Sequence, residues 1–308
     1  MEVVNESDGF RVGIEVRASA LKAVAIDRSG RIAASQSTPL SDNQPTLPQI
    51  KELIAKLRSD FGEFEKIGIA VPGLINRKTG RVTYSVHIPE HSDIDFANEI
   101  IDAAGLKCFV ENDANAAAYG ELVLGAGRGC DNFFYATLGD GVGGAFIFGG
   151  EIWHGASGFA GELGYVPINS EGMRLEEVAS SPNIIRRTRS RFHYDSTSSL
   201  NKLPEEAITL DDIIAAANAD DDFAQMMLER TGVYVGTAVA TVINLLNLER
   251  IVIGGDIMQA KSLVLNAIKE RASELSFEPA YAATEIVEGE LGEYAAAAGA
   301  ALLAATNL

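Results

Sequence analysis

Residues 110–120 read VENDANAAAYG, in which the end of an apolar strand is followed by polar groups that open an alanine-rich helix. Further along the chain, residues 137–144 read TLGDGVGG, a glycine-rich turn after a second apolar segment. The first segment therefore predicts a strand-to-helix junction that presents the carboxylate of Asp113, and the second predicts a turn with exposed backbone. These two features decide the expected fold and site.

A carboxylate beside a glycine-rich turn suits the transfer of a phosphoryl group to a hydroxyl. Such a reaction needs a base for the hydroxyl proton and groups that stabilise charge on the phosphoryl oxygens. Asp113 is the candidate base, and glycines let backbone N–H groups approach phosphate closely. Each motif also has a simpler interpretation, because an Asp at a helix start is often only an N-cap and a G-x-G-G run is often only a hairpin turn.

Four segments resemble, in the same order, those of the ROK family of sugar kinases and sugar-responsive repressors. They are residues 69–76 (IAVPGLIN), 110–116 (VENDANA), 155–164 (GASGFAGELG) and 242–255 (VINLLNLERIVIGG). The resemblance covers nearly the whole chain and implies an α/β fold of the actin-like (ribonuclease H-like) ATPase type. That fold has two lobes with a ligand cleft between them. Function is argued separately, since one fold hosts several activities.

The pattern of apolar residues agrees with an α/β chain that contains a duplicated unit. Residues 11–17, 22–27 and 31–37 predict a three-stranded meander, and residues 133–138 and 144–148 begin a second one. By the resemblance, residues 1–111 plus 292–308 form the N-terminal lobe and residues 112–291 the C-terminal lobe. The other expected elements are helices at 45–61, 94–104, 223–246, 260–275 and from 292, and strands at 66–71, 107–111, 250–253 and 285–287.

The resemblance assigns a sugar site to four residues. Asn112 and Asp113 would contact sugar hydroxyls, and Asp113 would also take the proton of the attacking hydroxyl. Glu162, in the GELG segment, aligns with a glutamate that binds the sugar ring, and Glu176 aligns with the glutamate that ends the family's G-C-L-E motif. Carboxylates suit this task because each oxygen can accept hydrogen bonds from adjacent hydroxyls.

The chain departs from the family where many members bind zinc. Tyr165 stands in place of a histidine that is a zinc ligand and a sugar contact, and the cysteine cluster before Glu176 is missing. A structural zinc site needs four such ligands, so we expect no zinc. We expect the shortened loop to hold Glu162 and Glu176 by packing alone. Tyr165 either faces the sugar or packs as a core residue, and the core interpretation is favoured.

Two further departures fall on the phosphate loops. Residues 15–19 read EVRAS where the family has D-x-G-G-T, so the first loop offers Glu15, Arg17 and Ser19. In the second loop Asp140 replaces a threonine, and an acid near phosphate is unfavourable by roughly 4 kcal/mol at about 4 Å and an effective dielectric near 20. The remaining nucleotide-binding candidates are glycines: Gly139, Gly141, Gly143, Gly254 and Gly255.

These departures leave three hypotheses open. In one, Glu15 and Asp140 hold Mg²⁺, Arg17 clamps the terminal phosphate, and the protein is an ATP-dependent hexose kinase. In another, Arg17 and Asp140 pair where the phosphates would lie, and the protein is a non-catalytic sugar sensor or regulator. The third is a kinase of another polyol. The identity of the sugar depends on residues 87–95, where two histidines, His87 and His91, are expected to be surface residues.

The composition predicts a soluble intracellular protein that does not bind nucleic acid. The 308 residues are 47% hydrophobic and carry a net charge of −18, which opposes binding to a polyanion. The first strand begins around Arg11, so we expect no DNA-binding domain ahead of it. No signal peptide or membrane span is predicted, and Cys108 and Cys130 are expected to be reduced thiols. We expect a cytoplasmic homodimer, as in the family.

Overall fold

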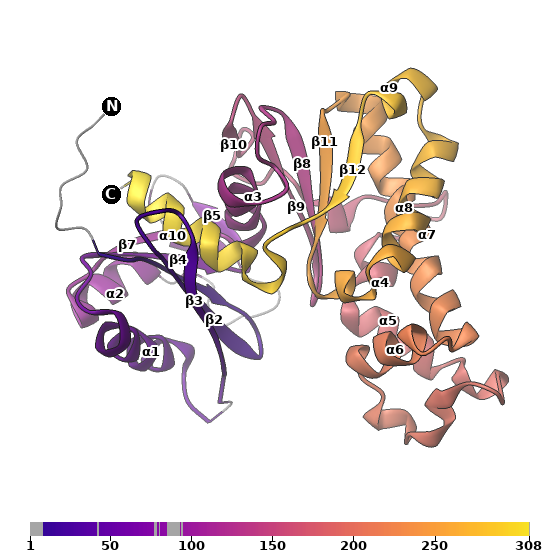
Figure 1. The fold of residues 1–308 in the computed structure, drawn as a ribbon, viewed down its shortest axis with the longest axis horizontal. Coiled ribbons are helices and arrows are strands. Elements are labelled where there is room, and N and C mark those ends of the chain that lie inside the picture. Colours follow the sequence, from indigo (N-terminus) through magenta and orange to yellow (C-terminus); the bar gives the residue numbers. More distant parts are fainter. Residues whose placement is uncertain are drawn as a thin grey trace. The chain divides into compact units, whose positions relative to one another are not determined.

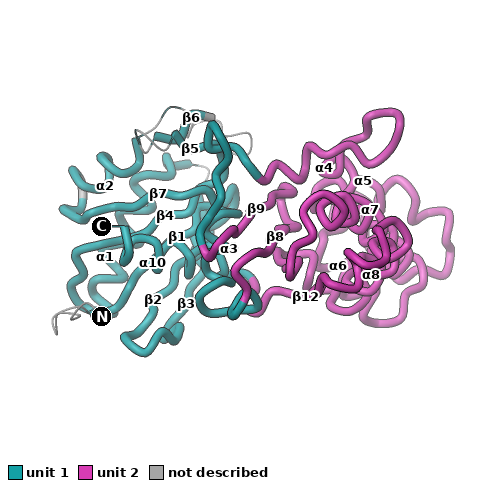
Figure 2. Tube along the Cα trace, turned by 90° about the horizontal axis from the view of Figure 1, so that it is seen from above, with its two compact units in different colours: residues 1–129, 151–160, 293–308 teal, residues 130–150, 161–292 magenta. Residues whose placement is uncertain are grey.

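The computed structural model describes residues 9–41, 43–76, 79, 81–84, 93 and 95–307. By its internal contacts the chain forms two compact units, drawn in different colours in Figure 2. Unit 1 comprises residues 1–129, 151–160 and 293–308, and unit 2 comprises residues 130–150 and 161–292. The C-terminal helix therefore belongs to the same unit as the first strands, and so does the segment that follows Asp113.

The sheet of unit 1 begins as an antiparallel meander and continues with parallel strands. The meander consists of β1 (Arg11–Val16), β2 (Ala20–Ile26) and β3 (Ile32–Pro39). Next to β1 lie β4 (Lys66–Val71) and then β7 (Lys107–Asn112), both parallel to it, so the order is β3-β2-β1-β4-β7. Because parallel strands end at the same edge of a sheet, Val71 and Asn112 are paired neighbours at the carboxyl edge.

One face of this sheet packs on the helices α1 (Thr46–Phe61) and α2 (Phe96–Ala104). Alternate residues of β1, namely Val12, Ile14 and Val16, point their side chains into this core. The predicted helical spacing of apolar residues in α1 is confirmed, since its buried side chains are Thr46, Ile50, Leu53, Ile54 and Leu57. The bulky hydrophobic residues of unit 1 are thus gathered on one side of the sheet.

The other face of the sheet carries α10 (Ala295–Asn307), and α10 also packs against α3 (Asp113–Leu124) (Figure 1). Eight of its 13 residues are alanine and one is glycine, so its backbone comes very close to its neighbours. A Cβ atom built on Gly13 of β1 would overlap the Ala297 carbonyl, and one built on Gly299 would overlap the carbonyl of Ala116 in α3. Glycine is required at these positions because there is no room for a side chain.

Three short strands complete unit 1. β5 (Leu74–Asn76) pairs with β6 (Arg81–Tyr84) in a two-stranded sheet, and β10 (Glu151–Trp153) lies against α3. None of the three was predicted, because runs this short carry too few residues for a periodic pattern. β5 follows directly after the Pro72-Gly73 turn at the end of β4.

The sheet of unit 2 repeats the pattern of unit 1, which confirms the predicted duplication. β8 (Phe133–Leu138) and β9 (Val142–Phe148) are antiparallel, and β11 (Arg250–Gly254) and β12 (Glu285–Glu288) continue the sheet in parallel with β8. The order of these strands is β9-β8-β11-β12. An antiparallel start followed by parallel strands in both units is the architecture expected of the actin-like fold.

Most of the rest of unit 2 is helical, and these helices cover its sheet (Figure 1). They include a single long central helix, α7, which packs closely against α8 through Gly232 and Gly236. The helices are α4 (Glu176–Ala179), α5 (Ser181–Arg189), α6 (Leu210–Asn218), α7 (Asp222–Leu246), α8 (Ser262–Leu275) and α9 (Glu278–Ala282). Among the described residues, no helix combines the length and hydrophobicity that crossing a bilayer requires.

The contact between α10 and α3 predicts a strong effect of Gly299→Val. Because a side chain at residue 299 would overlap the Ala116 backbone, which cannot rotate away, we expect the free energy of unfolding to fall by about 3 kcal/mol or more. Chemical denaturation measures it. Gly9→Val is the matched control, since the nearest atom to its Cβ would lie at 3.7 Å. Equal stability of the two variants would contradict the packing described here.

Candidate functional site

The predicted base lies at the junction of β7 and α3, at the carboxyl edge of the first sheet. Asn112 is the N-cap of α3, and its Oδ1 accepts the N–H of Asn115 at 3.1 Å. Asp113 is the first helical residue, and its Oδ1 accepts the N–H of Ala114 at 2.9 Å and the Asn112 amide at 3.0 Å. The capping function therefore falls on Asn112, and the simpler interpretation of Asp113 as the N-cap is wrong.

The V-P-G segment lies next to this junction. The Asn112 amide Nδ2 donates to the carbonyl oxygen of Gly73 at 3.1 Å. Gly73 has a φ of 133°, a conformation that L side chains rarely adopt, so the turn after β4 depends on glycine here. Two of the four motif segments thus meet at one edge of the sheet, and Asn112 connects them.

A buried carboxylate, Glu111, stands immediately before the junction. It is 6% exposed, and its Oε1 accepts the N–H of Asn112 at 2.8 Å and the amide of Asn115 at 3.1 Å. Its Oε2 lies 3.0 Å from Nε2 of His154, in the loop after β10. Burial pushes the pKa of Glu111 upward, but the hydrogen bond and charge of His154, with the two asparagine donors, outweigh it and lower the pKa.

The glycine-rich turn joins β8 to β9 in unit 2 and is, geometrically, a tight hairpin connection. The N–H of Gly139 donates to Gly141 O at 3.0 Å, and the carbonyl of Gly139 accepts the N–H of Ser181 at 2.7 Å. The N–H of Val142 donates to Oε2 of Glu176 at 3.0 Å. The turn is therefore held by the first residue of α5 and by the carboxylate that was predicted to bind sugar.

The end of β11 lies directly beside the same turn. Gly255 has a φ of 95°, and a Cβ atom there would overlap the backbone of Leu138, the residue before Gly139. Gly254 pairs with Thr137 in the parallel ladder. The structure thus brings together the two glycine segments that were predicted to line a nucleotide, although they are far apart in sequence.

Glu162 and Glu176 belong to unit 2, and Gly164, two residues after Glu162, packs against Glu176. Glu162 precedes the 3₁₀ helix η2 (Leu163–Tyr165) and is exposed, and Glu176 begins α4. A Cβ on Gly164 would lie 3.2 Å from Cβ of Glu176 and 2.5 Å from Val142 O. The G-E-L-G segment, Glu176 and the start of β9 therefore form one compact cluster beside the glycine turn.

The shortened loop is held by more than packing, which corrects the sequence-based expectation. Residues 166–175 form a small hairpin, with hydrogen bonds from Ile168 N to Met173 O at 2.9 Å and from Leu175 N to Val166 O at 3.0 Å. The guanidinium of Arg174 lies 4.4 Å from the ring centre of Tyr165. Tyr165 is 51% exposed, so the interpretation of Tyr165 as a core residue is wrong. Its assignment to the sugar stays a prediction.

The first phosphate loop is the turn between β1 and β2. Glu15 lies within β1, Arg17 donates its backbone N–H to Ala20 O at 2.9 Å, and the carbonyl of Ser19 accepts the N–H of Leu40 at 2.9 Å. Arg17 belongs to unit 1 and Asp140 to unit 2. Their proposed pairing, and the alternative roles of Glu15, Arg17 and Asp140 around Mg²⁺, stay predictions.

Sequence reasoning missed the Glu111–His154 pair. The only signal was the glutamate that precedes Asn112 in the VENDANA segment, and nothing in the sequence connects it to a histidine 43 residues away. The predicted surface histidines His87 and His91 lie outside the described residues. Across the ranges that the structure describes, no three His, Cys, Asp or Glu side chains gather where they could hold a metal ion.

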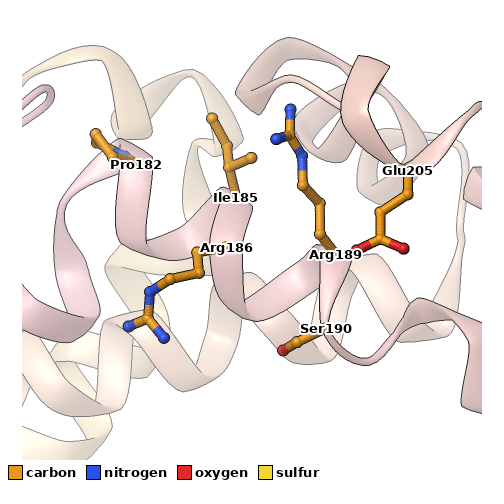
Figure 3. Close-up of a pocket in the computed structure, with 6 residues that line it drawn as sticks. All are labelled: Pro182, Ile185, Arg186, Arg189, Ser190 and Glu205. Atoms are coloured by element: carbon orange, nitrogen blue, oxygen red, sulfur yellow. The ribbon is translucent and has the colours of Figure 1, made fainter.

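A hollow of about 500 Å³ on unit 2 lies on α5, and none of the residues that line it belongs to these motifs (Figure 3). It is lined by Pro182, Ile185, Arg186, Arg189, Ser190 and Glu205. The arginines of α5 are a local exception to the acidic composition, but here they serve the fold: Arg189 donates to Ile208 O at 2.8 Å and Arg186 to Asn183 Oδ1 at 3.1 Å. The hollow therefore carries no feature of the predicted site.

Comparison with known proteins agrees with the geometry. The family model described as "ROK family" matches residues 11–307. The chain belongs to the ROK family. It is 32% identical to the glucokinase of Halalkalibacterium halodurans, over 92% of this chain and 89% of that protein. It is also 27% identical to the xylose repressor of Bacillus subtilis, over 97% of this chain and 78% of the repressor.

Solved structures of ROK proteins share the fold. A ROK family glucokinase from Streptomyces griseus, in complex with glucose and AMPPNP, superposes with a TM-score of 0.87 at 25% identity, covering 97% of this chain and all (100%) of that one. A ROK family transcriptional regulator, a homologue of the Escherichia coli MLC protein, superposes with a TM-score of 0.84 at 28% identity, covering 98% and 79%. The actin-like fold expected from the resemblance is confirmed, and the relatives include both kinases and repressors.

The lowered pKa of Glu111 predicts how stability depends on pH. A carboxyl whose folded pKa is depressed stabilises the fold above its unfolded pKa, near 4.5, and loses that contribution as pH falls through the folded pKa. Glu111→Gln should therefore reduce the free energy of unfolding by about 1–3 kcal/mol at pH 7, and the difference from wild type should shrink below pH 4.5.

Denaturant titrations from pH 3 to pH 8 measure this effect. Glu205→Gln is the control, because Glu205 forms a similar pair with His193 at 3.2 Å but is 47% exposed. An exposed pair contributes little, so we expect this variant to match wild type at every pH. If the free energy of unfolding of Glu111→Gln varied with pH in parallel with that of wild type, the assigned ionisation of Glu111 would be ruled out.

Proposed function

We propose that this protein is an ATP-dependent hexose kinase in which Asp113 is the general base. The observation that carries the proposal is the position of Asp113 at the carboxyl edge of the first sheet, at the start of α3. There its Oδ1 is engaged by the Ala114 N–H and the Asn112 amide, which orient the carboxylate. The 32% identity to a glucokinase over 92% of the chain supports the same reaction class.

The reaction needs one carboxylate as a base and others to bind the sugar. We assign the Asp113 carboxylate, oriented by two donors, to accept the proton of the sugar hydroxyl that attacks. Glu162 and Glu176 are assigned to the other sugar hydroxyls. Since Oε2 of Glu176 already accepts the N–H of Val142, its sugar contact and the glycine turn are linked through one side chain.

The residues around the glycine turn fit a nucleotide. The Ser181 hydroxyl beside Gly139 is buried without a hydrogen-bond partner among the described atoms, so a ligand group at the turn could pair with it. Gly255 lets the end of β11 pack against the Leu138 backbone next to this turn. We assign Gly139, Gly141, Gly143, Gly254 and Gly255 to the nucleotide, and Glu15 with Asp140 to Mg²⁺. Bound Mg·ATP would supply the phosphoryl group and charge stabilisation.

A second candidate function is a sugar-binding regulator without catalysis. It is favoured by the similarity to a xylose repressor over 97% of the chain and by the replacement of small phosphate-loop residues with Arg17 and Asp140. In that case the sugar site would persist while the nucleotide site would not. The cytoplasmic location and the homodimer stay predictions in either case.

Calorimetry separates the two functions. A kinase should bind both a hexose and Mg·AMPPNP, and with Mg·ATP should release ADP in a coupled assay that depends on the sugar. Titration of glucose, mannose, fructose and N-acetylated hexosamines in turn identifies the substrate. Hexose binding without detectable binding of Mg·AMPPNP would exclude the kinase and leave the regulator.

Asp113→Asn tests the general base. An asparagine keeps the size of the side chain but cannot accept a proton, so turnover should fall below detection, while the hexose Kd should change by less than about tenfold, or roughly 1.4 kcal/mol. Turnover is read from ADP release and affinity from calorimetry. Asp102→Asn, at an exposed position of α2, is the control and should retain wild-type turnover. Substantial turnover by Asp113→Asn would refute the assigned role.

A further inference from the structure

The pair formed by Glu111 and His154 has no part in the chemistry assigned so far, yet its two side chains are in contact and mostly buried. His154 Nε2 and Glu111 Oε2 lie 3.0 Å apart, and the two side chains are only 12% and 7% exposed. Burial makes this pair different from an ordinary surface contact. A carboxylate removed from water must be paired or hydrogen-bonded, so Glu111 holds His154 firmly in place.

The other oxygen of Glu111 forms hydrogen bonds at the junction that carries Asp113. This oxygen, Oε1, accepts the N–H of Asn112 and the side-chain amide of Asn115, which lie on either side of the predicted base. Asn112 and Asn115 are in turn connected by the N-cap hydrogen bond. The backbone at Asp113 is therefore enclosed by a hydrogen-bond network that starts at the Glu111 carboxylate.

The backbone of His154 forms a hydrogen bond that closes a loop. The carbonyl of His154 accepts the N–H of Ala160 at 3.2 Å and so closes the neck of the loop formed by residues 155–159. This loop contains the G-A-S-G motif and ends with exposed Phe159, next to Ala160. In sequence it leads directly into Gly161 and Glu162. The side chain of His154 thus connects the neck of this loop to Glu111 of unit 1.

We propose that His154 is a positioning residue that fastens the loop of residues 154–160 to the strand that carries Asp113. Through Glu111, the loop and the junction then move as one rigid part of unit 1. This inference rests on the proposed kinase function only for its catalytic consequence: a loosened junction places Asp113 less accurately, which lowers turnover more than it lowers sugar affinity. The mechanical coupling itself does not depend on catalysis.

Hydrogen–deuterium exchange of the protein without ligands tests the coupling. His154→Ala removes the donor, and Glu111→Gln weakens the acceptor, so in both variants exchange in peptides covering residues 154–160 should rise by about tenfold or more. His154→Gln keeps an N–H donor with similar reach and should stay within about threefold of wild type. His193→Ala is the control, because its pair with Glu205 has the same chemistry but is largely exposed.

The double variant and the kinetics complete the test. If the two residues act as one unit, His154→Ala combined with Glu111→Gln should exchange no faster than the worse single variant. In a kinase, kcat of His154→Ala should fall by about tenfold to a hundredfold while the hexose Kd changes less than about threefold. Restored kcat in His154→Gln would distinguish positioning from a general loss of stability.

The possible failures can be told apart. Unchanged loop exchange in His154→Ala, or exchange effects that multiply in the double variant, would overturn the coupling whether or not the protein is a kinase. A wild-type protein without phosphoryl transfer would remove the proposed function but leave the exchange test intact. Should His154→Ala not fold, His154→Asn replaces it, since its shorter amide cannot reach Glu111 and it should show the same faster exchange.

Discussion

The close approach of α10 to the first sheet and to α3 is the constraint on which the rest of unit 1 depends. An alanine helix can lie this near only because Gly13, Gly68 and Gly299 leave space for its backbone and for that of α3. This contact fixes α3, and the first residue of α3 is Asp113. The position of the predicted base is therefore determined by the last helix of the chain as much as by the strand before it.

Each unit contributes a preorganised part of the proposed site. In unit 1 a buried carboxylate and two asparagines fix the backbone around Asp113, the proposed base. In unit 2 the glycine turn is held from two sides, by Ser181 and by Glu176. Polar groups in both parts thus support the residues beside them, and the cost of burying Glu111 is offset by its hydrogen bonds with Asn112, Asn115 and His154.

The departures from the family pattern have different structural consequences. The loss of the zinc-site histidine and cysteines is accommodated locally: a short hairpin and the stacking of Arg174 on Tyr165 order the loop that leads to Glu176. The substitutions in the phosphate loops change charge instead. They place Arg17 and Asp140 in segments where the resemblance to the family leads one to expect small residues.

The fold class, most strands and the long helices could be predicted from the sequence, because hydrophobic periodicity and ordered motifs are local properties. The same motifs named Asp113, Glu162 and Glu176 as candidates, and their roles stay predictions. Sequence reasoning misjudged Tyr165, missed β5, β6 and β10, and could not reveal the contact of His154 with Glu111 or of Glu176 with Val142. Those contacts join residues that are distant in sequence. Tertiary packing brings their polar groups together, where each must find a hydrogen-bond partner because water is excluded.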